Sequence, residues 1–209
     1  MLGLRNISIF LKKSTPEVVK RLDTAAEIYR NRMQITALVG SPRRRGNTDL
    51  LVDQVLLGAE SRGYSGEKIY LYDYHISPCL DCRGCKTGSF DCHLEDGMPE
   101  IYPRLEKADV IVFGTPVYWY GPTAKMKLLI DRLRPFIASK RLLAKRGILV
   151  SPSEEGPGCC SPMVDMFRMS FHYLGIELAG SLLAKAYERG DIRSQPEELR
   201  RAWELGASL

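Results

Sequence analysis

Residues 35–48 form the segment that most constrains the fold of this 209-residue chain. The run at 35–39 (ITALV) is apolar and rich in β-branched residues, Gly40 and Pro42 end it, and a helical pattern begins at about Asn47. A short apolar run closed by glycine and proline is typical of a buried strand, so the segment predicts a strand, a loop and a helix. The free N–H groups and the dipole of that helix favour an anion in the loop.

The loop between this strand and helix is rich in side chains that donate hydrogen bonds to phosphate. They are Ser41, Arg43, Arg44, Arg45, Asn47 and Thr48. The loop has neither the G-x-G-x-x-G of dinucleotide sites nor the G-x-x-x-x-G-K-[ST] of P-loops, so a smaller phosphate ester is the expected ligand. The alternative is a solvated surface turn in which Asn47 or Thr48 is the helix N-cap.

Charge and hydropathy argue against a nucleic-acid-binding protein and against a membrane protein. The net charge is +5, but three positive residues stand together at 43–45 and the others are interspersed with acids. A local anionic ligand explains that cluster more economically than nucleic acid. The apolar runs are short, and residues 1–13 contain no signal-type apolar core. We therefore expect a soluble cytoplasmic protein without a membrane partner.

Apolar runs and amphipathic segments alternate from residue 34 to the C-terminus, which predicts one domain at 34–209. The pattern predicts strands at 35–39, 68–72, 109–114, 147–151 and 176–184, and helices at about 47–63, 99–107, 123–133, 162–174 and 196–205. Such alternation predicts an α/β fold with a doubly wound, five-stranded parallel sheet of flavodoxin-like order 2-1-3-4-5.

Residues 1–33 are predicted to be an N-terminal helical extension. Residues 14–17 (STPE) resemble a capping box, and apolar residues from Val18 to Tyr29 share one helical face. Amphipathicity requires only that this face be buried, so docking on the same subunit and contact with another subunit are both open.

The predicted strand order brings the loops after the first and third strands together, because ligands lie where the winding of the sheet reverses. The loop after the third strand contains Pro116, Val117, Tyr118, Trp119, Tyr120 and Gly121, and the loop after the fourth begins near Ser153. Phosphate donors beside an aromatic wall suit a flat ring that carries a phosphate, as in FMN. An oligomer surface is the alternative for the aromatic residues.

Four cysteines follow the second predicted strand, in a cysteine-rich insert at 79–92. Their spacing is Cys79-x2-Cys82-x2-Cys85-x6-Cys92. Three thiolates at successive x2 gaps and a fourth nearby can surround one small volume, as a [4Fe-4S] cluster requires. Zinc is a less favoured alternative, because zinc sites usually use two separated C-x-x-C pairs. Unligated thiols are another alternative.

Other reactive side chains receive structural interpretations. Cys159 and Cys160 have no base near them in sequence, and His75, His93 and His172 belong to no catalytic pattern. We interpret Asp131 and Arg132 as a structural ion pair.

Several of these motifs together resemble the NAD(P)H-dependent FMN reductase family of flavodoxin-like proteins. They are Gly40-Ser41-Pro42-Arg43 with Asn47-Thr48, Pro116-Val117-Tyr118, and Lys127 with Asp131-Arg132. The four-cysteine insert is similar to that of the iron-sulfur flavoproteins within this family, and the resemblance covers about residues 34–186. It implies that Ser41, Arg43, Asn47 and Thr48 bind the FMN phosphate and that 116–121 flank the isoalloxazine.

These observations predict an FMN-dependent oxidoreductase. It would move electrons from NAD(P)H or ferredoxin to a small redox substrate, with FMN and a [4Fe-4S] cluster as cofactors and no catalytic side chain. The alternatives are a cluster-free NAD(P)H-dependent FMN or quinone reductase, a non-enzymatic electron carrier, and a zinc-stabilised binding module. Exposed aromatics and an amphipathic arm also predict a homo-oligomer, a dimer or tetramer.

Overall fold

The computed structural model describes residues 33–209 of the chain. Apart from Met33, the predicted N-terminal extension at residues 1–33 lies outside the described residues. Among the residues described, every helix is too short or too polar to span a bilayer.

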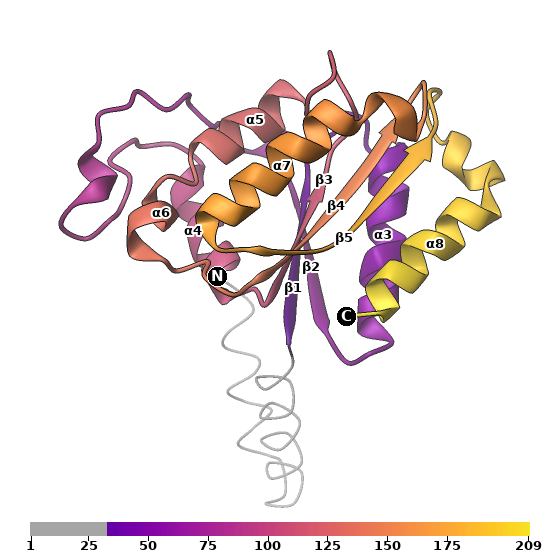
Figure 1. Cartoon of the computed structure of the whole chain (residues 1–209), viewed down its shortest axis with the longest axis horizontal. Helices are drawn as coiled ribbons and strands as arrows, with labels where there is room; N and C mark the ends of the chain where they lie inside the picture. Colours follow the sequence, from indigo (N-terminus) through magenta and orange to yellow (C-terminus); the bar gives the residue numbers. More distant parts are fainter. Residues whose placement is uncertain (1–32) are drawn as a thin grey trace, which may run out of the picture. The chain divides into compact units, whose positions relative to one another are not determined.

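Residues 34–209 form a five-stranded sheet in which all neighbouring strands are parallel (Figure 1). The strand order is β2-β1-β3-β4-β5, as predicted. Leu38 on the central strand is in register with Ile69 on one side and Phe113 on the other. The strands are β1 (Gln34–Val39), β2 (Ser65–Tyr70), β3 (Val110–Gly114), β4 (Arg146–Ser153) and β5 (Glu177–Lys185).

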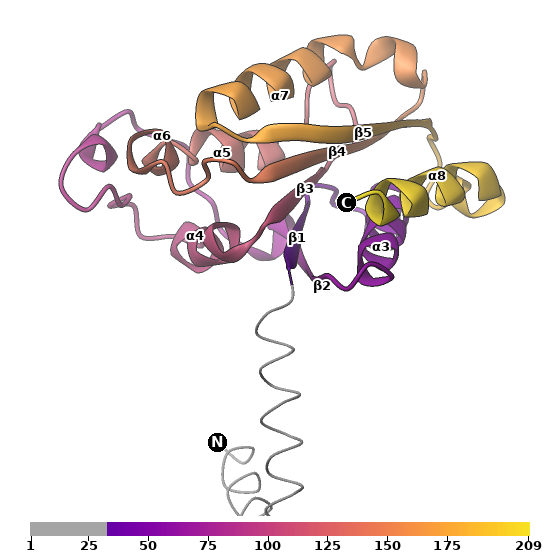
Figure 2. The same ribbon diagram turned by 60° about the horizontal axis from the view of Figure 1, so that its bottom comes forward.

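Helices cover both faces of the sheet, which makes three layers (Figure 2). Alternate residues of each central strand enter opposite cores, so Val110 and Val112 face α3 and α8 while Ile111 and Phe113 face α4, α5 and α7. The helices are α3 (Asn47–Glu60), α4 (Met98–Lys107), α5 (Ala124–Asp131), α6 (Pro135–Ser139), α7 (Ser161–Leu174) and α8 (Pro196–Ala207).

Helices α3 and α8 approach so closely that glycine is required on both. A Cβ atom at Gly58 would lie 2.0 Å from the Trp203 carbonyl oxygen, and one at Gly206 would lie 1.9 Å from the Val55 carbonyl oxygen. Both obstacles are backbone atoms, which cannot turn aside as a side chain can. The two glycines therefore allow α8 to complete the core on this face.

The structure corrects three of the predicted boundaries. Strand β2 begins at Ser65 instead of 68, because Ser65 pairs with Gln34 and the strand runs beside the whole of β1. Strand β4 continues to Ser153 because β5 pairs with it along that length. The predicted helix at 123–133 ends at Asp131, and the short helix α6 follows, with Pro135 in its first turn.

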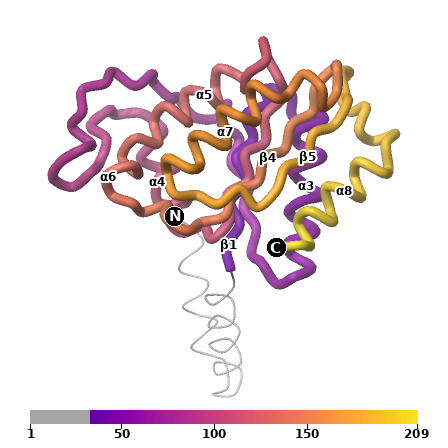
Figure 3. The backbone as a smooth tube through the Cα atoms, viewed as in Figure 1, coloured from indigo at the N-terminus to yellow at the C-terminus, as the bar shows by residue number. Residues whose placement is uncertain are grey.

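The cysteine segment lies between β2 and α4, as predicted, and is mostly irregular. It contains two short 3₁₀ turns, η1 (Leu71–Asp73) and η2 (Gly84–Lys86). Figure 3 shows this segment beside α6, away from the start of α3.

Candidate functional site

The loops that follow β1 and β3 are joined directly by hydrogen bonds. The Gly40 N–H donates to the Gly114 carbonyl over 2.7 Å, and the Thr123 hydroxyl donates to the Gly40 carbonyl over 2.6 Å. A Cβ atom at Gly40 would lie 2.9 Å from the Cβ of Met126, so a larger residue would force α5 away. Glycine at this position thus holds the two loops at the carboxyl edge of the sheet.

A cavity opens at this edge, and we call it the phosphate pocket. Eight predicted site residues line it, from the loops after β1 and β3, the first turn of α3 and the end of β4, and the segment after β5 completes it. The lining residues are Ser41, Arg43, Asn47, Thr48, Pro116, Val117, Tyr118, Pro152, Ser153, Glu154, Ala186 and Tyr187.

A second cavity, the aromatic pocket, adjoins the first and shares Val117, Ser153 and Glu154 with it. The two cavities therefore form one groove along the carboxyl edge. Gly121, a predicted site residue, lines neither cavity. The full lining of the aromatic pocket is Val117, Trp119, Tyr120, Ser153, Glu154, Glu155 and Cys159.

Helix α3 opens onto the phosphate pocket without a side-chain cap. Its N-cap is Gly46, which makes no side-chain hydrogen bond to the N–H groups of the first turn. The alternative of Asn47 or Thr48 as the N-cap is therefore wrong. The first N–H groups of an α-helix lack intrahelical acceptors, so this terminus is suited to an anion.

The side chain of Asn47 is committed to the protein's own backbone. Its Nδ2 donates to the Glu188 carbonyl over 2.8 Å, and its Oδ1 accepts from the N–H groups of Gly190 and Ile192. These bonds fix the connection between β5 and α8, which supplies Tyr187 to the phosphate pocket. The resemblance implies direct phosphate binding by Asn47, and the second Nδ2–H and the main-chain N–H of this residue remain available for a ligand in the pocket that it lines.

The three consecutive arginines have different surroundings. Arg43 lines the phosphate pocket, and its Nη1 donates to the Tyr187 carbonyl over 3.0 Å. Arg44 pairs with Asp73 and stacks on the ring of Tyr70, with the guanidinium carbon 3.4 Å from the ring centroid. Arg45 lines neither cavity. Only Arg43 is therefore positioned to meet an anion in the pocket.

The carboxylate of Asp49, in the first turn of α3, is neutralised by its neighbours. It accepts from the Lys68 ammonium over 2.7 Å, the Arg45 amide over 2.7 Å and the Tyr70 hydroxyl over 2.9 Å. Burial by itself would raise the pKa of Asp49, but these hydrogen bonds outweigh it and hold the pKa below its ordinary value. A negative charge near the phosphate pocket is thus compensated.

The lowered pKa of Asp49 predicts a loss of stability in acid. Because the folded pKa lies below the unfolded value of about 3.9, Asp49 stabilises the fold above that pH, and the contribution is lost as the pH falls through the folded value. We expect Asp49→Asn to lower the free energy of unfolding by about 1 to 3 kcal/mol at pH 7, and by less at pH 3. Urea denaturation of wild type and variant at about pH 3 and pH 7 measures this difference in the free energy of unfolding.

Asp53→Asn is the matched control, because Asp53 also pairs with Lys68 but its side chain is 45% exposed, against 3% for Asp49. We expect a smaller change in the free energy of unfolding there. Equal pH profiles for wild type and Asp49→Asn would contradict the assignment.

The loop after β3 (residues 116–121), which we call the aromatic loop, ends in a tight turn with an unusual backbone. Tyr118 and Gly121 exchange two main-chain hydrogen bonds, and Trp119 and Tyr120 between them have φ of 50° and 60°. Large side chains seldom adopt this left-handed conformation, and such strain gathers at functional sites. Tyr118, Trp119 and Tyr120 all line the groove, and Trp119 is 96% exposed. A flavin wall and a subunit contact both remain compatible with this turn.

The four cysteines of the insert are free thiols in different surroundings. Cys85 is buried, Cys82 is exposed, and Cys79 and Cys92 lie between. Burial raises the pKa of Cys85, and the neighbouring Cys92 and Cys79 act in the same direction. Within residues 33–209, no three or more ligating side chains converge on one point. The donors have the right chemistry for a cluster, and metal–sulfur bonds would supply the energy that gathers them.

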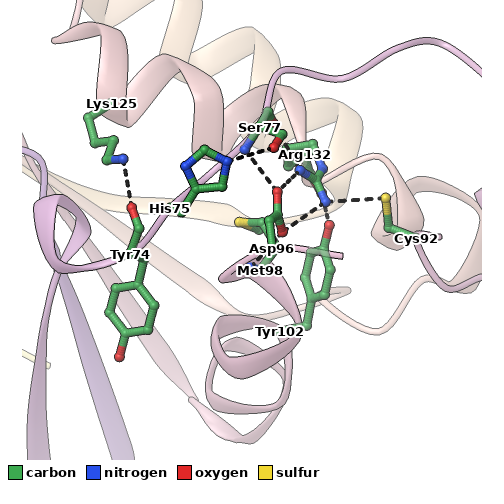
Figure 4. A network of polar contacts seen from close by, with 9 residues as sticks. All are labelled: Tyr74, His75, Ser77, Cys92, Asp96, Met98, Tyr102, Lys125 and Arg132. Atoms are coloured by element: carbon green, nitrogen blue, oxygen red, sulfur yellow. Dashed lines mark hydrogen bonds and ion pairs between the residues drawn. The ribbon is translucent and has the colours of Figure 1, made fainter. Parts of the chain in front are cut away.

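The predicted pairing of Asp131 with Arg132 is wrong. Asp131 pairs with Lys127 one turn earlier on α5, over 2.6 Å, whereas Arg132 turns inward to Asp96 (Figure 4). Successive residues on a helix point in different directions, so neighbours in sequence do not meet.

Sequence reasoning missed Tyr187 and Cys159 as groove residues. Tyr187 follows the end of β5, and the rule that ligands lie at strand carboxyl ends applies there too. Cys159 lines the aromatic pocket, whereas Cys160 is buried, which raises its pKa and agrees with the structural role expected of it.

Known proteins resemble this chain in sequence and in fold. A sequence model of the family described as NADPH-dependent FMN reductase matches residues 33–175. An iron-sulfur flavoprotein of Methanocaldococcus jannaschii is 37% identical over 59% of the chain, and the match spans 65% of that relative. The NAD(P)H-dependent FMN-containing oxidoreductase YwqN of Bacillus subtilis is 28% identical over 83% of the chain and 96% of its own length.

A solved structure extends the comparison. The Trp repressor binding protein of Bacillus subtilis superposes with a TM-score of 0.63 at 26% identity, over 82% of this chain and 98% of that one. The strand order β2-β1-β3-β4-β5 agrees with this similarity in fold. The chain therefore belongs to the NADPH-dependent FMN reductase family of FMN-dependent oxidoreductases, and within it resembles the iron-sulfur flavoproteins.

Proposed function

We propose that the protein holds FMN in the groove formed by the phosphate and aromatic pockets and moves electrons from NAD(P)H or ferredoxin to a small acceptor. The observation that carries this proposal is the chemical difference between the two ends of the groove. One end joins the uncapped start of α3 to Ser41, Arg43 and Thr48, and the other is walled by aromatic side chains. An anionic group and a flat ring would each meet suitable surroundings.

The chain's own residues would then bind, orient and shield. The first N–H groups of α3, with Ser41, Arg43, Asn47 and Thr48, would hold the phosphate. The Thr123–Gly40 bond would keep the loop after β1 against the aromatic loop after β3. Lys68 would compensate the charge of Asp49. FMN, when bound, supplies hydride and single-electron chemistry. No proton transfer by a side chain is required.

We further propose that Cys79, Cys82, Cys85 and Cys92 ligate a [4Fe-4S] cluster. Support comes from their spacing and from the name of the Methanocaldococcus relative. Such a cluster would pass single electrons between FMN and partners such as ferredoxin. The separated thiols favour a second candidate, a cluster-free NAD(P)H-dependent FMN or quinone reductase.

Assembly and location are proposals as well. We propose a homo-oligomer, supported by the exposed Trp119 beside the groove, and sedimentation at micromolar concentration tests it. Free cysteines throughout the described residues support a reducing, cytoplasmic location. We propose that the protein has neither a nucleic-acid partner nor a membrane partner.

Anaerobic purification followed by cofactor analysis tests the function. We expect about one FMN per subunit and oxidation of NAD(P)H with quinone or free flavin as acceptor. Bound FMN without NAD(P)H oxidation would favour an electron carrier. Apoprotein that binds no FMN at micromolar concentrations would contradict the proposal altogether.

A further inference from the structure

The most deeply buried charge in the described part of the chain lies beneath the cysteine segment, outside the groove. The side chain of Arg132, at the end of α5, is 1% exposed, and that of its partner Asp96 is fully buried. A buried ion pair seldom adds stability over apolar residues of similar size, because both charges lose their hydration. This pair therefore calls for a role other than stabilising the core.

The pair connects the two ends of the cysteine segment. Asp96 accepts from the N–H groups of Ser77 and Met98, over 2.8 and 2.9 Å, and Arg132 Nη1 donates to the Ser77 carbonyl over 2.9 Å. Arg132 Nη2 donates to Cys92 Sγ over 3.4 Å. Figure 4 shows the guanidinium between Asp96 and Cys92. Arg132 thus bonds both to the backbone at Ser77, before the first cysteine, and to the sulfur of Cys92, the last one.

Cys92, as a neutral thiol, is a poor hydrogen-bond acceptor for Arg132. A neutral thiol is a weak acceptor, whereas a charged donor is best paired with an anion. Arg132 Nε is also buried without a hydrogen-bond partner. A metal-bound thiolate is a stronger acceptor, so the buried guanidinium suits Cys92 as a cluster ligand better than Cys92 as a free thiol.

Further positive charge lies on the same side of the insert. Arg134, two residues beyond Arg132, pairs with Asp81 over 2.8 Å. Arg134, Asp81 and Lys86 line a cavity of about 470 Å³ together with Cys79. A cluster held by four thiolates is anionic, and cations and hydrogen-bond donors near its sulfurs stabilise the reduced form most. Arg134 and Lys86 thus place cations beside Cys79, and Asp81 and Asp131 balance them in the same lining.

We propose that Arg132, oriented by Asp96, is a positioning residue for the iron-sulfur cluster. It donates to the Cys92 ligand, sets the direction of that sulfur and raises the reduction potential of the cluster. The proposal rests on the cluster suggested under the proposed function. It also gives α5 a structural role, because Thr123 at its start bonds to Gly40 after β1 and Arg132 at its end contacts Cys92. The helix spans about 12 Å between them.

Arg132→Lys in the full-length chain, reconstituted anaerobically with iron and sulfide, tests this role. Lysine keeps the charge but lacks the planar fork that reaches Asp96, Ser77 and Cys92 together. Loss of such an outer hydrogen bond typically weakens metal binding by about 10- to 100-fold. We expect iron release to a ferrous chelator to accelerate by about that factor, and the cluster potential, followed by electron paramagnetic resonance, to fall.

Arg141→Lys is the matched control. Arg141 also anchors the insert, through the Ser89 carbonyl, Asp91 and Glu106, but contacts no sulfur. Wild-type iron release and potential in Arg141→Lys, with both altered in Arg132→Lys, would support the proposal. Equal changes in both variants, or a folded Arg132→Lys with wild-type behaviour, would overturn it.

Folding and cofactor loading are checked separately. If Arg132→Lys fails to fold, Asp96→Asn replaces it, because the guanidinium then loses the carboxylate that orients it. Iron release should accelerate as in Arg132→Lys, and wild-type iron release from folded Asp96→Asn would overturn the proposal. Wild-type protein that takes up no iron would overturn it too. The FMN content and NAD(P)H oxidation of the same samples report independently on the rest of the proposed function.

Discussion

Replacing Ser41 by aspartate is expected to weaken FMN binding about a thousandfold relative to Ser41→Asn. Ser41 is buried in the lining of the phosphate pocket, where its Oγ accepts from the Arg43 amide over 3.2 Å. A carboxylate about 4 Å from the phosphate would repel it by about 4 kcal/mol at the effective dielectric of a partly buried site. That energy corresponds to about a thousandfold in Kd.

The asparagine variant makes this comparison clean, because aspartate and asparagine have nearly the same shape and differ in charge. Titration of apoprotein with FMN, followed by the quenching of flavin fluorescence, measures both dissociation constants. Circular dichroism confirms that each variant is folded. Similar FMN affinities for the two variants would place the phosphate elsewhere and contradict the assignment of the pocket.

Gly206→Ala is expected to lower the free energy of unfolding by about 3 kcal/mol, the upper part of the usual range for overpacking. The new methyl group would lie 1.9 Å from the Val55 carbonyl oxygen and 2.9 Å from the Ala59 nitrogen, both on the backbone of α3. Relief requires α8 to move away from α3, which loosens the core on that face. Alanine's better helix propensity, about 1 kcal/mol, offsets only part of this cost.

Gly158→Ala is the control for this prediction, because a Cβ atom there would have no other atom within 4 Å. We expect its stability to stay within about 0.5 kcal/mol of wild type. Urea denaturation of both variants at pH 7 measures the difference. A Gly206→Ala variant as stable as Gly158→Ala would show that the two helices separate without cost.

Local patterns predicted the sheet and the place of the groove. The run at 35–39 is buried on both faces, and such runs recur at intervals that leave room for a helix between them. Parallel strands joined by right-handed crossovers have few arrangements, so the strand order followed. Ser41 and Pro116 follow strands and Ser153 ends one, and parallel strands end at one edge, so their meeting was predictable.

Long-range contacts could not be predicted in the same way. The insert's cysteines were identified by spacing, but spacing does not give the three-dimensional path of an irregular segment, and the described structure does not gather the thiols. The role of Asn47 depends on Glu188, 141 residues away. Tyr187 enters the phosphate pocket because that contact holds the connection after β5.

The sequence by itself determined the strands, their order and the edge at which the predicted ligand loops meet, because these depend on hydrophobic periodicity and chain connectivity. Only the tertiary structure decided which charges are paired. Arg132 lies beside Asp131 in sequence yet pairs with Asp96, 36 residues away, because the helix directs its side chain into the interior. A buried charge takes the partner that folding places within reach, and that partner is set by packing of the whole domain.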